Sequence, residues 1–477
     1  MNITVKTKDT LAVQALRQHA PRVVSKTQSV CPKCLKRIDA RLSIWGDAVF
    51  LEKTCADHGL FSTCIWRGSP GFESWTRPKV PTCPPVCHTK PEKGCPFDCG
   101  LCPEHRQRTC ATLLEVTHRC NLQCPVCFAH AGVSPSSDPV LEEINEWLAV
   151  VMRTAGDCNL QLSGGEPTVR DDLPDIIAMA KKSGFSFIQL NTNGLRLATD
   201  PDYVKSLKDA GLSSVFLQFD GVDDHVFLKL RGRALITVKE RAVENCIKNN
   251  IGIVLVPTIV KGLNDGQIGA LVDAAMDFGP GVRGIHFQPL SCFGRFPKKW
   301  NDRGRITLPE ILQALENQTR GRLRVSHFKP PGCENALCSF QGSFLRQPEG
   351  TLIPLNADSG KCCPGPEFAE AGALKAISSV AQKWTAPEFG CHTDDLLSVK
   401  GKTEVWHDFD VFIDTVAQNR FSISAMAFQD AWTLDLERLR DCCIHIFSPK
   451  NQARLIPFCA YNLTDIHGQS IYRRPSP

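Results

Sequence analysis

The chain has 477 residues, of which 42% are hydrophobic and 22% charged, a balance that excludes a disordered or fibrous protein and predicts two or three domains. The formal net charge is only +5, and no long basic run concentrates it, so neither a nucleic acid nor an anionic membrane is an expected partner. The 24 cysteines are more informative, because many are spaced two or three residues apart. In a reducing compartment such clusters indicate metal binding or catalysis before disulfides.

Two absences predict where the protein resides. The first ten residues, MNITVKTKDT, lack the basic, apolar and small-residue regions of a secretory signal. The longest apolar run, Ile251 to Val260, is far shorter than the roughly 18 residues that a membrane span requires. We therefore expect a cytoplasmic protein without a transmembrane segment.

The chain divides by composition into three predicted parts. Residues 1–90 form a Cys-rich domain resembling a rubredoxin or a zinc knuckle, 91–300 a core domain with a preceding cysteine loop, and 301–477 a C-terminal cysteine-containing region. Before Ala111 the sequence has little periodicity and is rich in Cys, Pro and Gly, so it can bury little apolar area. Bound metal is the predicted organiser of that segment.

The first cysteines in the chain have the spacing of two metal knuckles. Cys31 and Cys34 are separated by two residues, and Cys55 is followed by His58 at the same interval. This arrangement suits a tetrahedral ion, either zinc or a rubredoxin-like iron. His58 is the predicted fourth ligand, with Cys64 as the alternative, because a lone histidine is often only a hydrogen-bonding group.

A cysteine triplet follows in the segment CPFDCGLC. Cys95, Cys99 and Cys102 have no predicted strand before them and no glycine loop in register. We predict an auxiliary iron–sulfur cluster here, which relays electrons or holds substrate, with a zinc site as the alternative. Cys83 and Cys87 could extend either this site or the N-terminal one.

The middle of the chain alternates strand-like and helix-like segments, the pattern of a parallel α/β sheet. The predicted strands are Ala111–Thr117, Asn159–Ser163, Ser186–Asn191, Ser214–Phe219, Gly252–Val260 and Arg283–Gln288. The predicted helices are Leu141–Arg153, Asp171–Ser183, Pro201–Ala210, Thr237–Asn250 and Asp265–Phe278, with a further one at Pro309–Gln318. Six such units predict a partial (β/α)6 barrel, with its ligands at the C-terminal ends of the strands.

A second cysteine triplet comes directly after the first predicted strand of this barrel. Cys120, Cys124 and Cys127, in CNLQCPVC, can hold three irons of a 4Fe-4S cluster and leave the fourth iron open. A closed four-cysteine cluster needs one further thiol, and Cys110 or Cys158 could provide it. Spacing alone does not decide between these alternatives.

Three more loops at predicted strand ends suit one small molecule. SGGEP at 163–167 has paired glycines that permit close approach of a ligand to the backbone. NTNG at 191–194 has short polar side chains suited to ribose hydroxyls, and QFDG at 218–221 ends the fourth strand.

This combination resembles the radical S-adenosylmethionine (SAM) superfamily, which places C-x3-C-x2-C after its first strand and a GGEP-type loop after its second. The resemblance implies that Cys120, Cys124 and Cys127 ligate the cluster whose open iron binds SAM. It also implies that the methionine moiety lies along Gly164, Gly165, Glu166 and Pro167, with Asn193, Gln218 and the 256–257 stretch near ribose and adenine. The chemistry implied is reductive cleavage of SAM to a 5′-deoxyadenosyl radical, which abstracts hydrogen from an unactivated C–H bond.

The C-terminal region contains further cysteines. Cys443 and Cys459 lie at the two ends of a predicted strand hairpin that presents them to one site. A second auxiliary cluster there and simple buried thiols are both consistent with the pattern. Cys246, inside a predicted helix, is expected in the core. Other cysteines of uncertain role include Cys333, Cys338, Cys362, Cys363 and Cys391.

Nearly the whole chain is similar to one branch of the superfamily. The segments KGCPFDCGLCPEH, VTHRCNLQCPVCF, IHFQPLSCFGRF and IPFCAYN resemble the tetraether lipid synthase family, which includes pterin-methylating enzymes and uncharacterised bacterial relatives. The resemblance implies C–C bond formation or one-carbon transfer on a lipid or pterin-like substrate, with a ferredoxin or flavodoxin as reductant. The alternative function is a non-catalytic iron–sulfur or zinc protein that carries electrons or serves as a scaffold.

Overall fold

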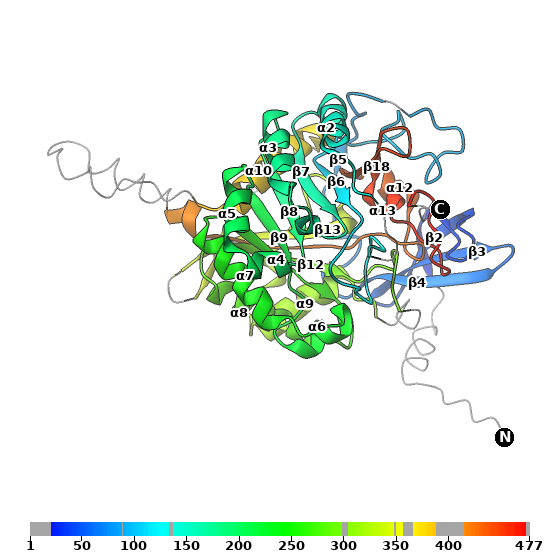
Figure 1. The fold of residues 1–477 in the computed structure, drawn as a ribbon. Helices are drawn as coiled ribbons and strands as arrows, with labels where there is room; N and C mark the ends of the chain where they lie inside the picture. Colours follow the sequence, from blue (N-terminus) through cyan, green and yellow to red (C-terminus); the bar gives the residue numbers. More distant parts are fainter. Residues whose placement is uncertain are drawn as a thin grey trace, which may run out of the picture.

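The N-terminal part folds into a small antiparallel sheet. The computed structural model describes residues 21–87, 89–132, 137–297, 304–347, 350–355, 366–387 and 415–473. The first strands, β1 (Arg22–Val30), β2 (Arg37–Trp45), β3 (Ala48–Cys55) and β4 (Gly59–Arg67), pair in sequence order (Figure 1). Residues 22–67 thus form regular strands, although the sequence there has little periodicity. These strands escaped prediction because their burial alternates irregularly, for example in β2.

Six adjacent parallel strands form the centre of a large sheet. They are β6 (Ala111–Thr117), β7 (Asn159–Gly164), β8 (Ile188–Thr192), β9 (Ser214–Gln218), β10 (Gly252–Val256) and β12 (Val282–Pro289). The predicted fifth strand divides at Pro257, which lacks a backbone N–H, and continues as β11 (Thr258–Ile259). The six strands follow the predicted order.

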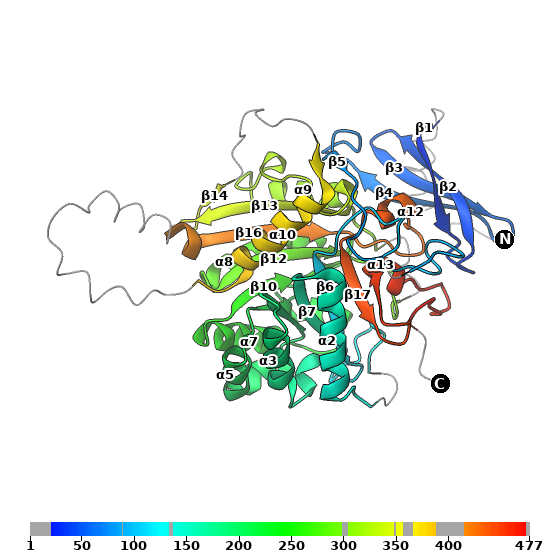
Figure 2. The same cartoon turned by 90° about the horizontal axis from the view of Figure 1, so that it is seen from above.

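Helices cover the outer face of these strands (Figure 2). The predicted ones are α2 (Leu141–Ala155), α3 (Leu173–Lys182), α5 (Pro201–Asp209), α7 (Ile236–Lys248), α8 (Ile268–Asp277) and α9 (Leu308–Gln318). Two short helices, α4 (Leu195–Thr199) and α6 (Asp224–Arg231), were not predicted, and single 3-10 turns occur at Pro167–Val169, Asp265–Gln267, Val325–His327 and Ala336–Cys338. The fold is the predicted α/β partial barrel.

The C-terminal region completes both edges of the same sheet. On one edge β16 (Arg420–Met426) runs parallel to β12, followed by antiparallel β13 (Ser339–Arg346) and β14 (Leu352–Pro354). On the other edge β17 (Ile444–Ser448) runs parallel to β6 and forms a hairpin with β18 (Arg454–Pro457). These five strands thus extend the barrel sheet.

Shorter elements fasten the parts together. β5 (Lys79–Val80) pairs with β15 (Glu367–Phe368), and α12 (Leu436–Arg440) and α13 (Phe458–Tyr461) flank the C-terminal hairpin. Helix α10 (Ala369–Trp384) packs against β7, β10, β12 and β16. The carbonyl of Trp384 lies only 2.1 Å from where a Cβ on Gly252 would stand, at the start of β10. Helix α10 therefore lies at the N-terminal end of the barrel strands.

The hydrophobic core is built around strands that carry apolar side chains on both faces. Every residue of β10 is buried, as expected for a central parallel strand with cover on each side. Cys246 in α7 is buried in this core, as predicted. Cys362, Cys363, Cys391 and the N-terminal ten residues lie outside the described residues.

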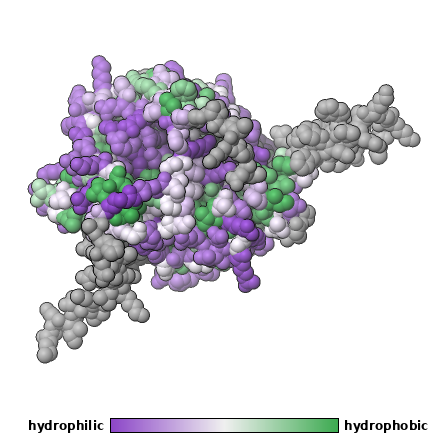
Figure 3. Space-filling view, turned by 180° about the vertical axis from the view of Figure 1, so that it is seen from behind, coloured by the Kyte–Doolittle hydropathy of each residue, from purple (hydrophilic) through white to green (hydrophobic). Residues whose placement is uncertain are grey.

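The surface carries no large apolar belt on the face shown in Figure 3, which is mainly hydrophilic with scattered hydrophobic groups. Among the described residues, no helix is long and apolar enough to cross a membrane.

Candidate active site and metal centres

One cavity of about 570 Å³ occupies the inside of the partial barrel. At the C-terminal ends of the strands it is lined by Cys120, Cys124 and Cys127. Towards the N-terminal ends it reaches Cys110 and Trp384. The predicted ligand site at the C-terminal ends of the strands therefore opens into an interior that extends to the opposite end.

The predicted cluster loop follows β6 without an intervening element. Burial raises the pKa of the Cys120 thiol to about 12, so a bound metal is needed to hold it as a thiolate at neutral pH. Cys110 lies at the other end of β6, and the sulfur of Cys158 is 3.3 Å from the Thr112 hydroxyl near the start of that strand. Both thiols therefore lie too far along β6 from this loop to complete a four-cysteine cluster with it.

Two arginines from distant segments clamp the cysteine loop. The backbones of Cys127 and Arg295 exchange hydrogen bonds of 2.8 and 2.9 Å, and Arg295 Nε donates to the carbonyl of Cys124 at 2.6 Å. Near the C-terminus, Arg473 donates to the Ala129 carbonyl at 3.1 Å and forms an ion pair with Glu115. Sequence reasoning missed both arginines, because nothing local links them to the loop.

A buried ion pair lies beneath the same loop. Arg231 donates two hydrogen bonds of 2.7 Å to Asp220, and a third of 3.0 Å to the carbonyl of Val126. Burial opposes the charge of the guanidinium, yet Asp220 raises the pKa of Arg231 above its ordinary value. Burial raises the pKa of the Cys124 thiol, while the nearby Arg231 cation lowers it. Arg231 therefore places a cation beside a predicted ligand, and Asp220 balances that charge.

The paired glycines allow two loops to approach each other closely. A Cβ on Gly164, which has φ +121°, would lie 2.1 Å from the carbonyl oxygen of Thr117, and one on Gly165 would lie 2.0 Å from that of Arg119. The Gly165 N–H instead donates to the Thr117 carbonyl at 2.7 Å. No other residue fits here, because any side chain would displace the backbone that leads into the cysteine loop.

Glu166 ties the second loop to the third. Its carboxylate accepts hydrogen bonds from the Thr192 hydroxyl and the Asn193 N–H, each at 2.6 Å, and from the Thr168 hydroxyl at 2.7 Å. Burial raises the pKa of Glu166, and these hydrogen bonds partly offset that rise. Gly164, Gly165 and Glu166 line the cavity, whereas Pro167 begins a 3-10 turn behind it.

Asn193 and Gln218 also line the cavity, and one lysine connects them. Lys239 Nζ donates to the Asn193 carbonyl at 2.5 Å and to Gln218 Oε1 at 3.3 Å. Burial lowers the pKa of this lysine to about 8. The Asn193 amide nitrogen donates to Asn121 Oδ1, within the cysteine loop, at 2.7 Å.

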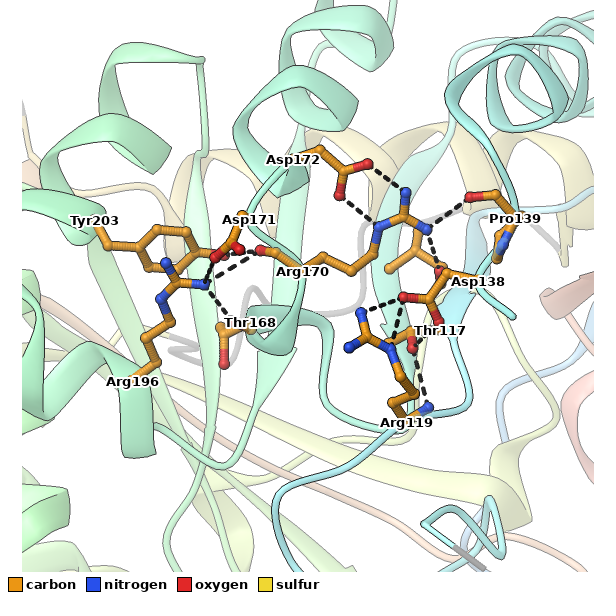
Figure 4. A network of polar contacts seen from close by, with 11 residues as sticks. Thr117, Arg119, Asp138, Pro139, Thr168, Arg170, Asp171, Asp172, Arg196 and Tyr203 are labelled. Atoms are coloured by element: carbon orange, nitrogen blue, oxygen red, sulfur yellow. Dashed lines mark hydrogen bonds and ion pairs between the residues drawn. The ribbon is translucent and has the colours of Figure 1, made fainter. Parts of the chain in front are cut away.

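A polar network on the outer side supports these loops (Figure 4). Arg170 donates to the carbonyls of Val116 and Pro139, each at 2.9 Å, and is paired with Asp172. Arg196 donates to the Thr168 carbonyl at 3.0 Å. The loops after β6, β7 and β8 are thereby held in one relative position, the arrangement that binding a single ligand requires.

The upstream triplet is supported by the C-terminal segment. The Tyr472 hydroxyl accepts from the Cys99 N–H at 2.6 Å and donates to the Pro96 carbonyl at 2.7 Å. The sulfurs of Cys83 and Cys87 are 3.6 Å apart. Burial raises the pKa of Cys87 to about 11, and the charge of Cys102 contributes in the same direction. Cys87 therefore lies on the side of the upstream triplet.

The N-terminal sheet gathers the four residues of the predicted knuckles. Ligand atoms of Cys31, Cys34, Cys55 and His58 all lie within 4.8 Å of one another. His58 Nδ1 is 3.5 Å from the sulfurs of both Cys31 and Cys55. Cys64, the alternative fourth ligand, is outside this group and donates to the carbonyl of Trp66.

The predicted C-terminal hairpin exists, with Cys443 and Cys459 at its two ends. The Cys443 sulfur lies within 4.8 Å of those of Cys110 and Cys333, a group that does not include Cys459. Burial raises the pKa of Cys459 to about 12, and the neighbouring Cys338 contributes to that rise. Cys459 lies in the helical turn α13 after β18, whereas Cys443 directly precedes β17, and a shared cluster of the two stays a prediction.

The fold and this site define a radical SAM enzyme: a partial parallel barrel has three cysteines after its first strand and a double-glycine loop after its second. The pattern of the radical SAM superfamily matches residues 114–275, and that of the HMPTM N-terminal zinc ribbon domain matches residues 23–67. The cofactors of the superfamily are a 4Fe-4S cluster and SAM, and a loop of three closely spaced cysteines fits that pair.

Individual relatives narrow the assignment. A 7,8-dihydro-6-hydroxymethylpterin dimethyltransferase from Methanocaldococcus jannaschii is 33% identical over 488 residues, 94% of this chain and 94% of the relative. The chain therefore belongs to the family of this pterin dimethyltransferase within the radical SAM superfamily. A GTP 3',8-cyclase from Paenarthrobacter nicotinovorans is 30% identical over 221 residues, 45% of this chain and 60% of the relative. Streptococcus suis SuiB bound to S-adenosylmethionine matches 45% of this chain and 49% of its own at 14% identity, with a TM-score of 0.37.

Proposed function

We propose that the protein is a radical SAM enzyme that transfers a one-carbon unit, or forms another C–C bond, on a pterin-like heterocycle. The observation that carries this proposal is the polar and aromatic lining of the cavity deeper than the cysteine loop. Membership of the pterin dimethyltransferase family supports the same class of substrate.

The proposed cofactor site uses the residues at the C-terminal ends of the strands. Cys120, Cys124 and Cys127 would hold three irons, and 164–167 would lie along the methionine moiety of SAM. Asn193 and Gln218 would lie near ribose and adenine. When bound, cluster and SAM supply a 5′-deoxyadenosyl radical for hydrogen abstraction from a C–H bond. The chain's own residues position that pair, and Lys239 keeps the Asn193 and Gln218 side of the site aligned.

A row of amides crosses the barrel interior where the substrate would lie. Asn191 donates to Gln161 at 3.3 Å, and Gln161 donates to Gln189 at 3.0 Å. Within the described part of the chain, the buried side-chain oxygens of Asn159 and Asn191 have no hydrogen-bond partner. A buried acceptor without a donor costs about 1–3 kcal/mol. A heterocycle with N–H groups can supply donors here, and a lipid tail cannot.

An aromatic group borders the same region. The ring of Phe216 is 5.3 Å from that of His286 and 5.5 Å from that of Trp384, measured between centroids. All three residues line the cavity. Burial lowers the pKa of His286 to about 4, so its ring is neutral at physiological pH. Flat neutral rings beside amides suit a planar heterocycle.

The remaining metal sites are proposed to support this reaction. Cys95, Cys99 and Cys102, with Cys87, would hold an auxiliary iron–sulfur cluster, and Cys338, Cys442 and Cys459 are candidates for a second one. The N-terminal ribbon would hold zinc or a rubredoxin-type iron through three cysteines and His58. A ferredoxin or flavodoxin would supply the electron, in the reducing cytoplasm that the cysteine content suggests.

The test is an anaerobic incubation of the reconstituted protein with SAM, dithionite and 7,8-dihydro-6-hydroxymethylpterin. We expect the pterin to gain the mass of one or two methyl groups, measured by mass spectrometry, and to increase the yield of 5′-deoxyadenosine. Each methyl group would come from a second SAM molecule, which leaves as S-adenosylhomocysteine, and dithionite would supply the electrons. Asn191→Leu should raise the pterin KM about tenfold, because about 1.4 kcal/mol of hydrogen bonding is lost. Asn249→Leu, at the end of α7 and not in the cavity lining, serves as the matched control.

The outcomes separate the substrate from the enzyme class. If SAM is cleaved, but the pterin neither stimulates the cleavage nor is itself consumed, the proposed substrate is excluded. The assignment of radical SAM chemistry would still stand. Joining of two lipid chains, in a parallel incubation in which a lipid replaces the pterin, would favour the C–C coupling alternative.

A further inference from the structure

Three cysteines far apart in the sequence meet at the end of the cavity opposite the cysteine loop. The sulfurs of Cys110, Cys333 and Cys443 all lie within 4.8 Å of one another. We propose that they bind a single divalent cation of the zinc class, with a fourth coordination position open to a donor atom in the cavity. The proposal rests on these three residues and does not depend on the identity of the substrate.

The sheet topology brings two of these cysteines together. Cys110 directly precedes β6 and Cys443 directly precedes β17, and the two strands are parallel neighbours in which Ala111 pairs with Ile444. The N–H of Cys110 donates to the carbonyl of Cys443 at 2.8 Å. The two thiols are therefore fixed at adjacent starts of paired strands, on rigid backbone rather than on a loop.

Two buried or half-buried side chains hold the third cysteine against this pair. The carbonyl of Cys333 accepts a hydrogen bond from Lys79 Nζ at 2.8 Å and another from Gln107 Nε2 at 2.6 Å. Lys79 also donates to the carbonyl of Glu334. The Cys333 loop thus has a defined position, and that position presents its sulfur to the other two.

The spacing of the sulfurs fits one ion better than a cluster. The N-terminal ribbon gathers its four ligand atoms within the same 4.8 Å limit. With metal–sulfur bonds of about 2.3 Å, tetrahedral geometry places thiolates about 3.8 Å apart. The cysteines of the loop after β6, where a larger 4Fe-4S cluster is proposed, do not form such a close group among the described residues.

The fourth position opens towards the cavity. Cys110, Cys333 and Cys443 all line it, together with the carboxylate of Glu334. Glu334 Oε2 lies 3.9 Å from the Cys443 sulfur, yet Glu334 is not among the residues whose ligand atoms lie within 4.8 Å of each other. Three protein ligands, a vacant fourth position and an adjacent carboxylate are the features of a zinc site that binds an exchangeable ligand. The ligand class that fits is an anionic or soft donor atom.

The site lies too far from the cysteine loop to take part in hydrogen abstraction. The seven residues of β6 separate the two ends, about 23 Å at roughly 3.3 Å per residue. Ala373 and Ile377 of α10 pack around the three cysteines in an apolar group. The structure therefore assigns the site to holding the far end of a cavity ligand, not to the radical step.

The experiment counts metal and acid-labile sulfide in the full-length protein, purified and reconstituted anaerobically, for wild type, Cys333→Ser and Cys443→Ala. We expect each variant to lose about one zinc or iron and no sulfide, since one ion is held without inorganic sulfur. Cys246→Ala, a buried core cysteine outside every thiol group, should lose neither. Cys55→Ser should lose one different ion, and the Cys55→Ser/Cys333→Ser double variant should lose two.

The other outcomes overturn the proposal. Loss of about four irons together with four sulfides would show a cluster in place of a single ion. Unchanged metal in folded Cys333→Ser and Cys443→Ala proteins, checked by circular dichroism, would show that the three thiols are only core packing.

The open position has its own test. Cobalt(II) is loaded in place of the native ion, and the spectrum of Cys333→Ser is subtracted from that of the wild type. We expect the difference spectrum to show tetrahedral cobalt bands that shift when 2-mercaptoethanol is added as a thiolate probe. Tetrahedral bands that the probe leaves unchanged would contradict an exchangeable fourth position.

Discussion

The two ends of the barrel cavity present thiols in different ways. At the C-terminal ends of the strands, Cys120, Cys124 and Cys127 come from one eight-residue stretch. At the N-terminal ends, Cys110, Cys333 and Cys443 come from segments more than a hundred residues apart, and the pairing of β6 with β17 assembles them. The first group is defined by spacing and the second by topology.

This difference affects how each end responds to change. The local loop carries its predicted ligands within eight residues, but other parts of the chain set its position, through Arg231, Arg295 and Arg473. The assembled group carries its ligands on strand starts that the sheet already fixes. Substitution of a residue that supports the loop should therefore affect the end that carries Cys120, Cys124 and Cys127. Substitution of a cysteine should affect metal binding at either end.

The largest expected effect comes from the local loop. Cys124→Ala should remove about four irons and four sulfides, because a 4Fe-4S cluster needs its thiolates. The ion of the N-terminal ribbon should remain, since its ligands lie in a separate sheet. Iron, zinc and sulfide analysis of the reconstituted variant checks this, and full retention of iron would contradict the assignment of the loop.

The support beneath the loop should be the next most sensitive feature. Asp220→Asn leaves Arg231 buried without its counter-ion, which should lower the free energy of unfolding by about 3–5 kcal/mol. The exposed pair of Lys205 and Asp209 provides the control, because Asp209→Asn should cost no more than about 0.5 kcal/mol. Urea denaturation of both variants makes the comparison, and equal costs would refute the role of the buried pair.

Lys239 should make the stability of the loop end depend on pH. Its folded pKa of about 8 lies below its ordinary value of 10.5, so the unfolded state binds more protons between these values and stability rises with pH. Relative to Lys239→Met, the wild type should gain about 3 kcal/mol of unfolding free energy from below pH 8 to above pH 10.5. Denaturation of both proteins across this range tests it, and a constant difference would disprove the shift.

The smallest expected effect is a displacement of the glycine loop. Gly165→Ala forces a Cβ against the Arg119 carbonyl, 2.0 Å away, and should reduce SAM cleavage about a hundredfold through misplacement of the reacting groups. Gly266→Ala, where no atom lies within 4 Å of the added Cβ, should leave cleavage unchanged. The initial rate of 5′-deoxyadenosine formation compares the two, and similar rates would show that the close approach is not needed.

Much of the barrel could be predicted, because buried parallel strands are apolar throughout and alternate with amphipathic helices. β6 begins and ends where the pattern indicated. The N-terminal strands could not be predicted in this way, since a small sheet around a metal site does not need a regular apolar face. The short helix α6 was missed too, although it carries Arg231 to the site.

The candidate metal-ligand groups were likewise predictable only in part from the sequence. The sulfurs and the imidazole of the N-terminal ribbon lie close together, as the two-residue spacings indicated. The hairpin pattern indicated Cys443 and Cys459 at its two ends, but it did not reveal that a helical turn begins at Phe458. Cys110 and Cys333 had no local signal, since only the parallel pairing of β6 and β17 and the Lys79 contact bring them to Cys443.

The most direct test of the account is the formation of 5′-deoxyadenosine by the reconstituted wild-type protein with SAM and dithionite, quantified by mass spectrometry. The account predicts the product in the wild type and in Cys246→Ala, and none in Cys124→Ala. Its absence from wild-type protein that carries its full iron and binds SAM would contradict the central claim that this cavity performs radical SAM chemistry.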